Sequence, residues 1–83
     1  MKAERRPFAV FGFNSTHEAL QAERALLAAD IEVALIPTPR ALGSLCGFAV
    51  RVPAAMSEAA ARILDDARID PTGLIEIEDR VGR

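Results

Sequence analysis

Apolar runs along the 83-residue chain predict four strands, which we place over residues 8–13, 32–36, 48–52 and 74–78. The first run, FAVFGF, contains no polar side chain, which is typical of a strand buried on both faces. The third alternates, with Phe48 and Val50 on one face and Arg51 on the other. The fourth, LIEIE, also alternates, so we expect one of its faces to lie in water.

Helical spacing of apolar residues predicts one helix after the first strand and another after the third. Ser15 with Glu18 three positions later forms a capping box, so the first helix should begin there and end near Asp30. The stripe of the second helix consists of Met56, Ala60, Ile63 and Ala67, widened by Leu64. From these patterns we expect the most buried residues to include Phe11, Leu26, Val50 and Ile63.

The resulting order, β-α-β-β-α-β, predicts an α+β fold of the ferredoxin-like type. Four antiparallel strands should form one sheet with both helices on one face. The length suits a single domain over residues 1–83, with flexible tails at 1–6 and 79–83.

Composition and charge argue against several classes of function. The formal net charge is −2, and there is no basic face with aromatic residues, so we expect no binding to nucleic acid. The longest uncharged run, 41–50, is too short to cross a membrane, and the charged start is unlike a signal peptide. A lone cysteine forms no internal disulfide, which favours a reducing cytoplasm.

The candidate chemistry lies in the segment 36-IPTPRALGSLCGFAVRV-52, around Cys46. A lone cysteine is often a small buried hydrophobe. Gly47, which follows it, allows the backbone to turn tightly and to present the sulfur and amide donors. Arg40 and Arg51 could stabilise the thiolate or an anionic cargo. Both readings of the cysteine therefore stand.

Two hydroxyl side chains, Thr38 and Ser44, lie in the same segment. Each could donate a hydrogen bond to a bound anion, but the favoured reading is that they satisfy the backbone of their own loop. His17 has no second ligand at metal-binding spacing, so no metal site is expected. No nucleotide-binding or catalytic motif is present, so we expect neither an enzyme, nor catalytic residues, nor a cofactor.

The elements 36-IPTPR-40 and 46-CGFAVR-51, with the helix and strand over 15–33, resemble the putative selenium/sulfur carrier protein-like family. The resemblance implies a small ferredoxin-like domain and a carrier thiol at Cys46. Sulfur or selenium would come from a cysteine desulfurase or a selenocysteine lyase and would pass to an acceptor protein. This chain departs from the family pattern at 43-GSLC-46, where fewer serines precede the cysteine, and at Asp30, which replaces a glycine.

An alternative from a different class is a regulatory or metabolite-binding module. In that case the 37–46 loop binds an anionic ligand and Cys46 is structural, an analogy that rests on the fold alone. The accessibility of the sulfur separates the two hypotheses. Self-association into a homodimer stays open, as does the choice between sulfur and selenium.

Overall fold

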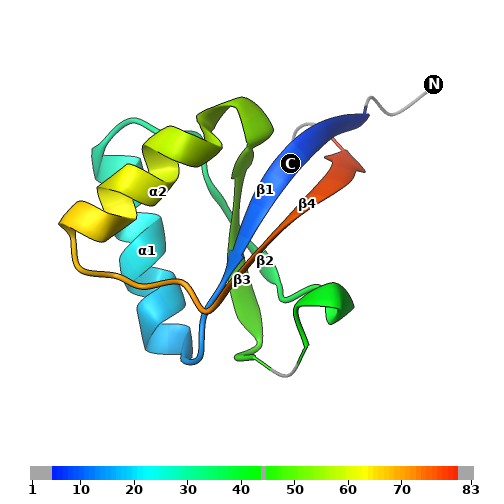
Figure 1. The fold of residues 1–83 in the computed structure, drawn as a ribbon, viewed down its shortest axis with the longest axis horizontal. Helices are drawn as coiled ribbons and strands as arrows, with labels where there is room; N and C mark the ends of the chain where they lie inside the picture. The colour runs from blue at the N-terminus through cyan, green and yellow to red at the C-terminus, as the bar shows by residue number, and fades with distance from the viewer. Residues whose placement is uncertain (1–4, 44, 81–83) are drawn as a thin grey trace.

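The computed structural model describes residues 5–43 and 45–80 of the chain. Its elements follow the order expected from the sequence (Figure 1). The helices and strands are β1 (Arg5–Gly12), α1 (Thr16–Ala28), β2 (Ala34–Pro37), β3 (Phe48–Pro53), α2 (Ser57–Asp66) and β4 (Gly73–Arg80). Two short 3-10 turns, η1 (Arg40–Leu42) and η2 (Ala54–Met56), precede β3 and α2 respectively.

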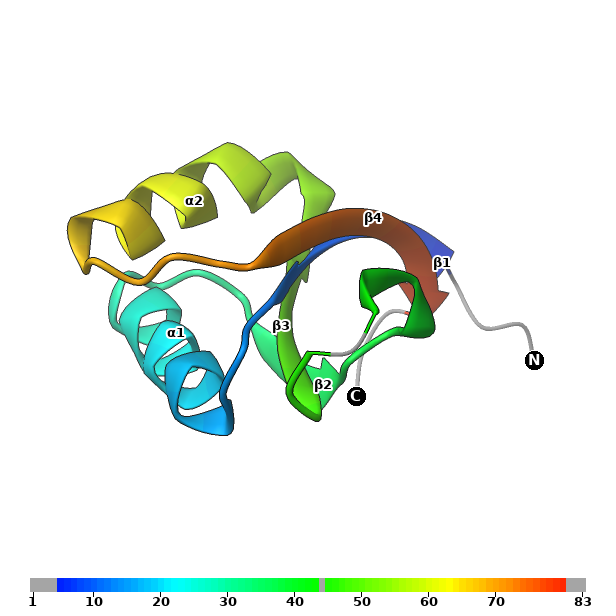
Figure 2. The ribbon, with the colours of Figure 1, turned by 60° about the horizontal axis from the view of Figure 1, so that its bottom comes forward.

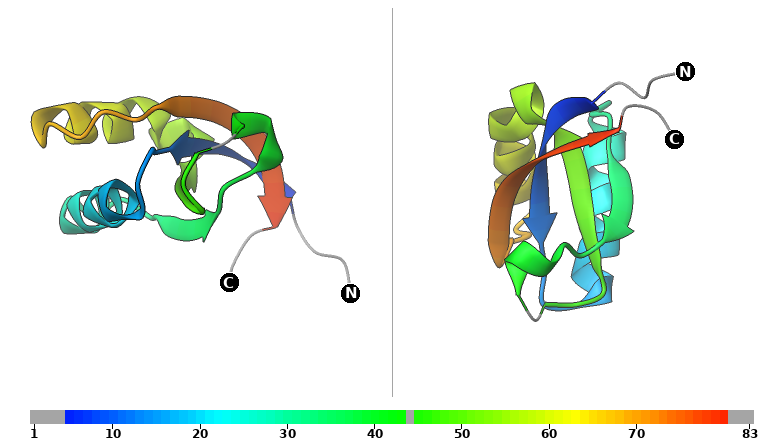
Figure 3. Two further views of the ribbon diagram at one scale, coloured as in Figure 1. Left: turned by 90° about the horizontal axis from the view of Figure 1, so that it is seen from below. Right: turned by 90° about the vertical axis from the view of Figure 1, so that its right-hand side faces the viewer.

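The four strands form one antiparallel sheet in the order β2-β3-β1-β4. Both helices lie against the same face of this sheet, as the views in Figures 1 and 3 show. The predicted ferredoxin-like fold is therefore confirmed. Strand β1 lies inside the sheet between β3 and β4, and all residues from Phe8 to Phe13 are buried, which explains its uninterrupted apolar run.

The core between helices and sheet contains three of the four residues expected there: Phe11, Leu26 and Val50 are buried. The expectation for Ile63 is wrong, because this side chain is only partly buried. Leu64 is buried instead, together with Ala60 one turn before it. Because positions four apart share one face of a helix, this pair defines the face of α2 that meets the sheet, and Ile63 lies beside it.

The helix termini have local causes. The hydroxyl of Ser15 accepts a hydrogen bond from the Glu18 N–H at 3.1 Å, so the predicted N-cap of α1 is confirmed. Both helices end in the same hydrogen-bond pattern. The Ile31 N–H donates to the Leu26 carbonyl at 3.0 Å in α1, and the Ile69 N–H to the Leu64 carbonyl at 2.9 Å in α2.

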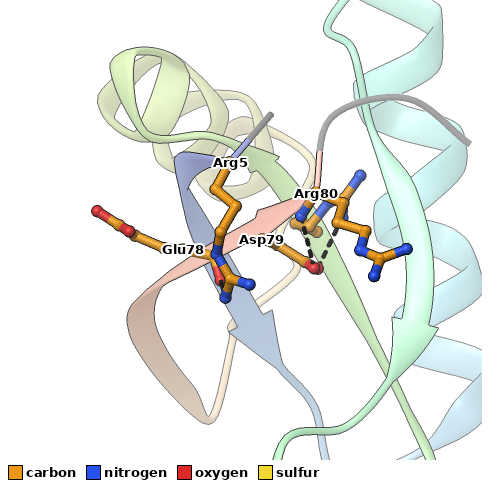
Figure 4. Close-up of polar contacts among 5 residues, drawn as sticks. Arg5, Glu78, Asp79 and Arg80 are labelled. Carbon is orange, nitrogen blue, oxygen red and sulfur yellow. Dashed lines mark hydrogen bonds and ion pairs between the residues drawn. The ribbon is translucent and has the colours of Figure 1, made fainter. Parts of the chain in front are cut away.

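The first and last strands of the chain, β1 and β4, run further than expected. The sequence pattern places residues 5, 6, 79 and 80 in flexible tails, but in the structure Arg5 pairs with Arg80, and Arg6 with Asp79, in the ladder between β1 and β4. An Arg5 guanidinium nitrogen also donates to the Glu78 carbonyl at 3.3 Å (Figure 4). These cross-strand contacts hold the ends of both strands in the sheet. The remaining parts of the predicted tails, 1–4 and 81–83, lie outside the described residues.

Candidate functional site around Cys46

The segment between β2 and β3 carries the cysteine and folds back over the face of the sheet that the helices leave open. Figure 2 shows the η1 turn on that side, beneath the arch of β1 and β4. Gly43 ends η1 with a positive φ of 80°, and its N–H donates to the Arg40 carbonyl at 2.9 Å. Since this conformation strains residues with a side chain, a glycine at position 43 suits the sharp reversal toward Cys46.

The backbone of Cys46 is held from two directions. Its N–H donates to the carbonyl of Phe13 at 3.0 Å, just after β1 ends. Its carbonyl accepts a hydrogen bond from the Thr38 hydroxyl at 2.6 Å, and the Thr38 N–H donates to the Gly47 carbonyl at 3.1 Å. Together these bonds extend the pairing of β2 and β3 into the loop and place Cys46 at the end of the central strands.

The thiol of Cys46 is half-buried and packs against the edge of the helix-side core. Its sulfur donates to the carbonyl of Phe48 at 3.0 Å. This bond needs the thiol proton, so ionising the sulfur or adding an atom to it breaks the bond. Phe48 itself is 42% exposed, so the thiol has an apolar, solvent-facing neighbour. The sequence allowed either a buried, structural cysteine or an exposed, reactive one, and the observed thiol is intermediate between the two.

Arg51 lies on the open face of the sheet, opposite Phe48 and Val50, as its place in β3 predicts. Its guanidinium binds the Asp79 carboxylate at 2.8 Å and stacks 4.1 Å from the centre of the Phe8 ring. Its side chain is only 12% exposed. The contacts of Arg51 thus direct it toward β1 and β4, whereas the thiol of Cys46 bonds to Phe48 and packs toward the helix side.

The partner of Arg51, Asp79, is electrostatically perturbed. A hydrogen bond from the Arg80 N–H is the main cause that lowers the pKa of the Asp79 carboxyl below its ordinary value of 3.8, and the hydrogen bond from Arg51 adds to it. Figure 4 shows the Asp79 carboxylate beside Arg80 at the end of β4. The ion pair connects β3 to the edge strand β4, and the Asp79 carboxylate offsets much of the positive charge of Arg51.

Of the other predicted site residues, Thr38 and Gly47 form hydrogen bonds within the loop, and Arg40 is exposed to solvent. The Thr38 hydroxyl satisfies the loop backbone, which was the favoured reading of this residue. The Gly47 carbonyl takes part in the same pairing. Arg40 is the first residue of η1, and its side chain is exposed to solvent in the loop that carries Cys46. Ser44 lies outside the described residues.

Two leucines that sequence reasoning missed attach this loop to the sheet. Leu42 and Leu45 lie over Gly12 and Gly73, which face each other in the ladder between β1 and β4. The signal was present as a glycine inside the otherwise bulky run 8-FAVFGF-13, because a glycine in a strand often marks a close approach of other atoms. Its partner could not be read from local pattern, since it lies some sixty positions along the chain at Gly73.

A hollow of about 200 Å³ opens elsewhere, between the start of β2 and the end of β3. It is lined by Phe8, Glu32, Val33, Ala34, Arg51 and Pro53. Within residues 5–43 and 45–80, no three histidine, cysteine or acidic side chains gather as metal ligands would. The same residues contain no helix with the length and apolar character needed to cross a membrane.

Fold and site together define a small ferredoxin-like α+β protein whose single cysteine lies in the loop between β2 and β3. The chain belongs to the family described as "Putative Se/S carrier protein-like", whose model matches residues 8–76. The match includes the Pro-Thr-Pro-Arg and Cys-Gly elements of the loop. Comparison with curated proteins and with solved structures found no match.

Proposed function

We propose that this protein carries sulfur or selenium on Cys46 and passes it to an acceptor protein. The observation that carries the proposal is the placement of the thiol. Cys46 is half-buried at the end of the sheet, and its backbone is bonded on one side to Phe13 and on the other to Thr38. A carrier needs such a compromise, because its sulfur must be reachable by a partner yet shielded from unspecific reaction. The family description points to the same cargo.

The transfer step is a thiol exchange that requires no outside oxidant. The thiolate of Cys46 attacks the outer sulfur of a persulfide on a donor such as a cysteine desulfurase. A new S–S bond forms on Cys46 while the S–S bond of the donor breaks, and the donor thiolate takes up the proton that Cys46 released. A selenium atom from a selenocysteine lyase would follow the same route, and the acceptor receives the atom by a second exchange.

In this proposal the chain supplies placement and charge, and the bond-making chemistry that generates the persulfide stays with the donor. Arg40 is exposed on the loop, where its positive charge would favour approach of an anionic persulfide. Arg51 contributes through the packing of the open face, because Asp79 and Phe8 already engage its guanidinium. Arg40 is therefore the solvent-facing cation that the loop offers to the cargo, whereas Arg51, in β3, is a structural cation on the open face of the sheet.

The proposal is tested by measuring whether one sulfur or selenium atom is transferred to Cys46. The protein is incubated with a cysteine desulfurase and cysteine, or with a selenocysteine lyase and selenocysteine, and its intact mass is measured. We expect a gain of one sulfur or one selenium atom that dithiothreitol removes and that Cys46→Ser abolishes. Arg40→Ala should slow the transfer without preventing it, whereas Arg24→Ala, an exposed arginine on α1, should not.

Two results would count against the carrier. One is the absence of any adduct on a folded protein, and the other is an adduct that survives in Cys46→Ser. Saturable binding of inorganic anions to the 37–46 loop in Cys46→Ser, without any transfer to the wild type, would instead support the binding-module alternative.

A further inference from the structure

The loop that carries Cys46 rests on a place in the sheet where two strands lack side chains. Gly12 ends β1, Gly73 begins β4, and the two are direct partners in the antiparallel ladder. Both point to the face opposite the helices, together with Val10 and Ile75 of the same strands. Because neither glycine has a Cβ atom, atoms of the loop can come close to the strand backbone here, at the end of the sheet nearest Cys46.

Leu42 and Leu45 occupy the space that side chains at these two positions would need. A Cβ atom on Gly12 would lie 2.6 Å from Cδ1 of Leu45 and 3.0 Å from Cδ1 of Leu42. A Cβ atom on Gly73 would lie 2.8 Å from Cδ2 of Leu42. Side-chain carbons do not approach so closely, so a methyl group at either glycine requires the leucine above it to move. Neither glycine has a positive φ that would explain its presence.

Both leucines lie within four positions of the thiol in the sequence. Leu42 ends η1, and Leu45 is the residue immediately before Cys46. Where the leucine side chain cannot turn aside into another rotamer, the backbone of Leu45 has to shift, and this shift moves the adjoining Cys46 N–H, which bonds to Phe13 at 3.0 Å. The leucines contact the open face of the sheet, and Cys46 is hydrogen-bonded at the end of the sheet. Both sets of contacts therefore hold the same short segment of the loop.

We propose that Gly12 and Gly73 are positioning residues for Cys46, because they form a seat for Leu45 and Leu42 that sets where the thiol lies. The seat acts through the loop and touches neither cargo nor partner. Its value for transfer rests on the proposed function, but its effect on the thiol does not, and a small alkylating reagent reports that effect directly.

The experiment compares Gly12→Ala, Leu45→Ala and the double variant with the wild type. Gly12→Ala should push Leu45 off the sheet, and Leu45→Ala should remove the contact, so each should speed alkylation of Cys46 in the folded protein. We expect at least about a fivefold increase, which corresponds to roughly 1 kcal/mol in the loop equilibrium. In the double variant the new methyl group occupies the space that Leu45 vacates, so its alkylation rate should lie closer to that of the wild type than either single variant does.

Transfer from a donor protein supplies a second readout. A displaced loop meets a small reagent more easily but presents the thiol less accurately to a protein partner, so transfer should slow while alkylation speeds up. General destabilisation would also expose the thiol, so the free energy of unfolding of each variant is measured as well, and the increase in alkylation must exceed what global opening at that stability supplies. Leu74→Ala is the matched control, because Leu74 follows Gly73 in β4 and is 52% exposed. It should leave both rates unchanged.

The outcomes separate the seat from the carrier. Unchanged alkylation in both single variants, or a double variant whose effect equals the sum of the two, would overturn the seat even if the wild type accepts sulfur. A seat that behaves as expected in a protein that accepts neither sulfur nor selenium would overturn the carrier alone. If Gly12→Ala does not fold, Gly73→Ala with Leu42→Ala provides the same comparison through the second leucine.

Discussion

At the scale of single residues, Thr38 explains why a hydroxyl lies between two prolines in the loop. Pro37 and Pro39 each restrict the backbone, and neither has an N–H to offer. Thr38 supplies both donors in their place, since its N–H reaches Gly47 and its hydroxyl reaches the Cys46 carbonyl at 2.6 Å. The Pro-Thr-Pro element therefore connects the exit of β2 to the cysteine.

Replacing Thr38 with valine keeps the shape of the side chain but removes the bond to Cys46. The carbonyl of Cys46 would lose a partner, so we expect Thr38→Val to lower the free energy of unfolding by about 1 kcal/mol. Alkylation of Cys46 should also become faster, because one of the two bonds that hold its backbone is gone. Thr72→Val is the control, since Thr72 is exposed and its backbone bond to Gly12 is retained. Equal alkylation rates in the two variants would show that the Thr38 hydroxyl does not hold the cysteine.

At the scale of elements, the two helices end alike although their sequences differ. Asp30 and Arg68 follow the last turns of α1 and α2, and both have a φ of 62°. Glycine is the residue that adopts this left-handed conformation most easily. The apolar residue after each, Ile31 and Ile69, forms the hydrogen bond that closes the helix. Each closure therefore retains some backbone strain.

Arg68→Gly should relieve that strain. A side chain in the left-handed region costs roughly 1–2 kcal/mol, part of which glycine returns through the greater freedom of the unfolded chain. We expect a net gain of about 0.5–1 kcal/mol in the free energy of unfolding, measured by urea denaturation. Ala67→Gly, one residue earlier at φ −84°, should instead destabilise the protein. Destabilisation by Arg68→Gly would mean that its side chain contributes more than its backbone costs.

At the scale of the whole molecule, Asp79 connects the far end of β4 to β3 across the intervening strand. Its carboxylate accepts from Arg51 and from the Arg80 N–H, each at 2.8 Å. The pKa of Asp79 is lowered in the folded protein, first by the Arg80 N–H and then by Arg51. The folded state therefore binds this proton less tightly than the unfolded chain does. The ionised carboxylate stabilises the fold above about pH 4, and this contribution is lost as the pH falls through the lowered pKa.

Asp79→Asn should therefore be less stable than the wild type at pH 7 and should approach it in acid. Because Asp79 remains partly exposed, we expect a difference of no more than about 1 kcal/mol at neutral pH. Thermal or urea unfolding at pH 7, 5 and 3 measures it. Glu76→Gln, at an exposed position of the same strand, should show no comparable dependence. A difference between Asp79→Asn and the wild type that stays constant down to pH 3 would contradict the assigned role of the carboxylate.

Local pattern was sufficient for much of this molecule. The strands, the helices and the ferredoxin-like order follow from apolar periodicity. The Ser15 cap follows from the spacing of Ser15 and Glu18, because the backbone N–H groups at a helix start lack partners within the helix. The Pro-Thr-Pro-Arg and Cys-Gly elements also indicated the family before any geometry was known. These features depend on residues within one or two turns of each other, which is why the sequence alone determined them.

Tertiary structure decided which distant residues meet. Arg51 was expected beside the thiol because the two are close in sequence, but successive strand residues face opposite sides, and the charge of Asp79 draws its guanidinium toward β4. Leu64 and not Ile63 is buried in the core, because the face of α2 that packs inward runs through Ala60 and Leu64, and the helix pattern alone did not show which side of the stripe would face the sheet. The seat for Leu42 and Leu45 exists only because antiparallel pairing brings Gly12 opposite Gly73. Such contacts depend on strand register, and one residue of slippage would reverse every side chain involved.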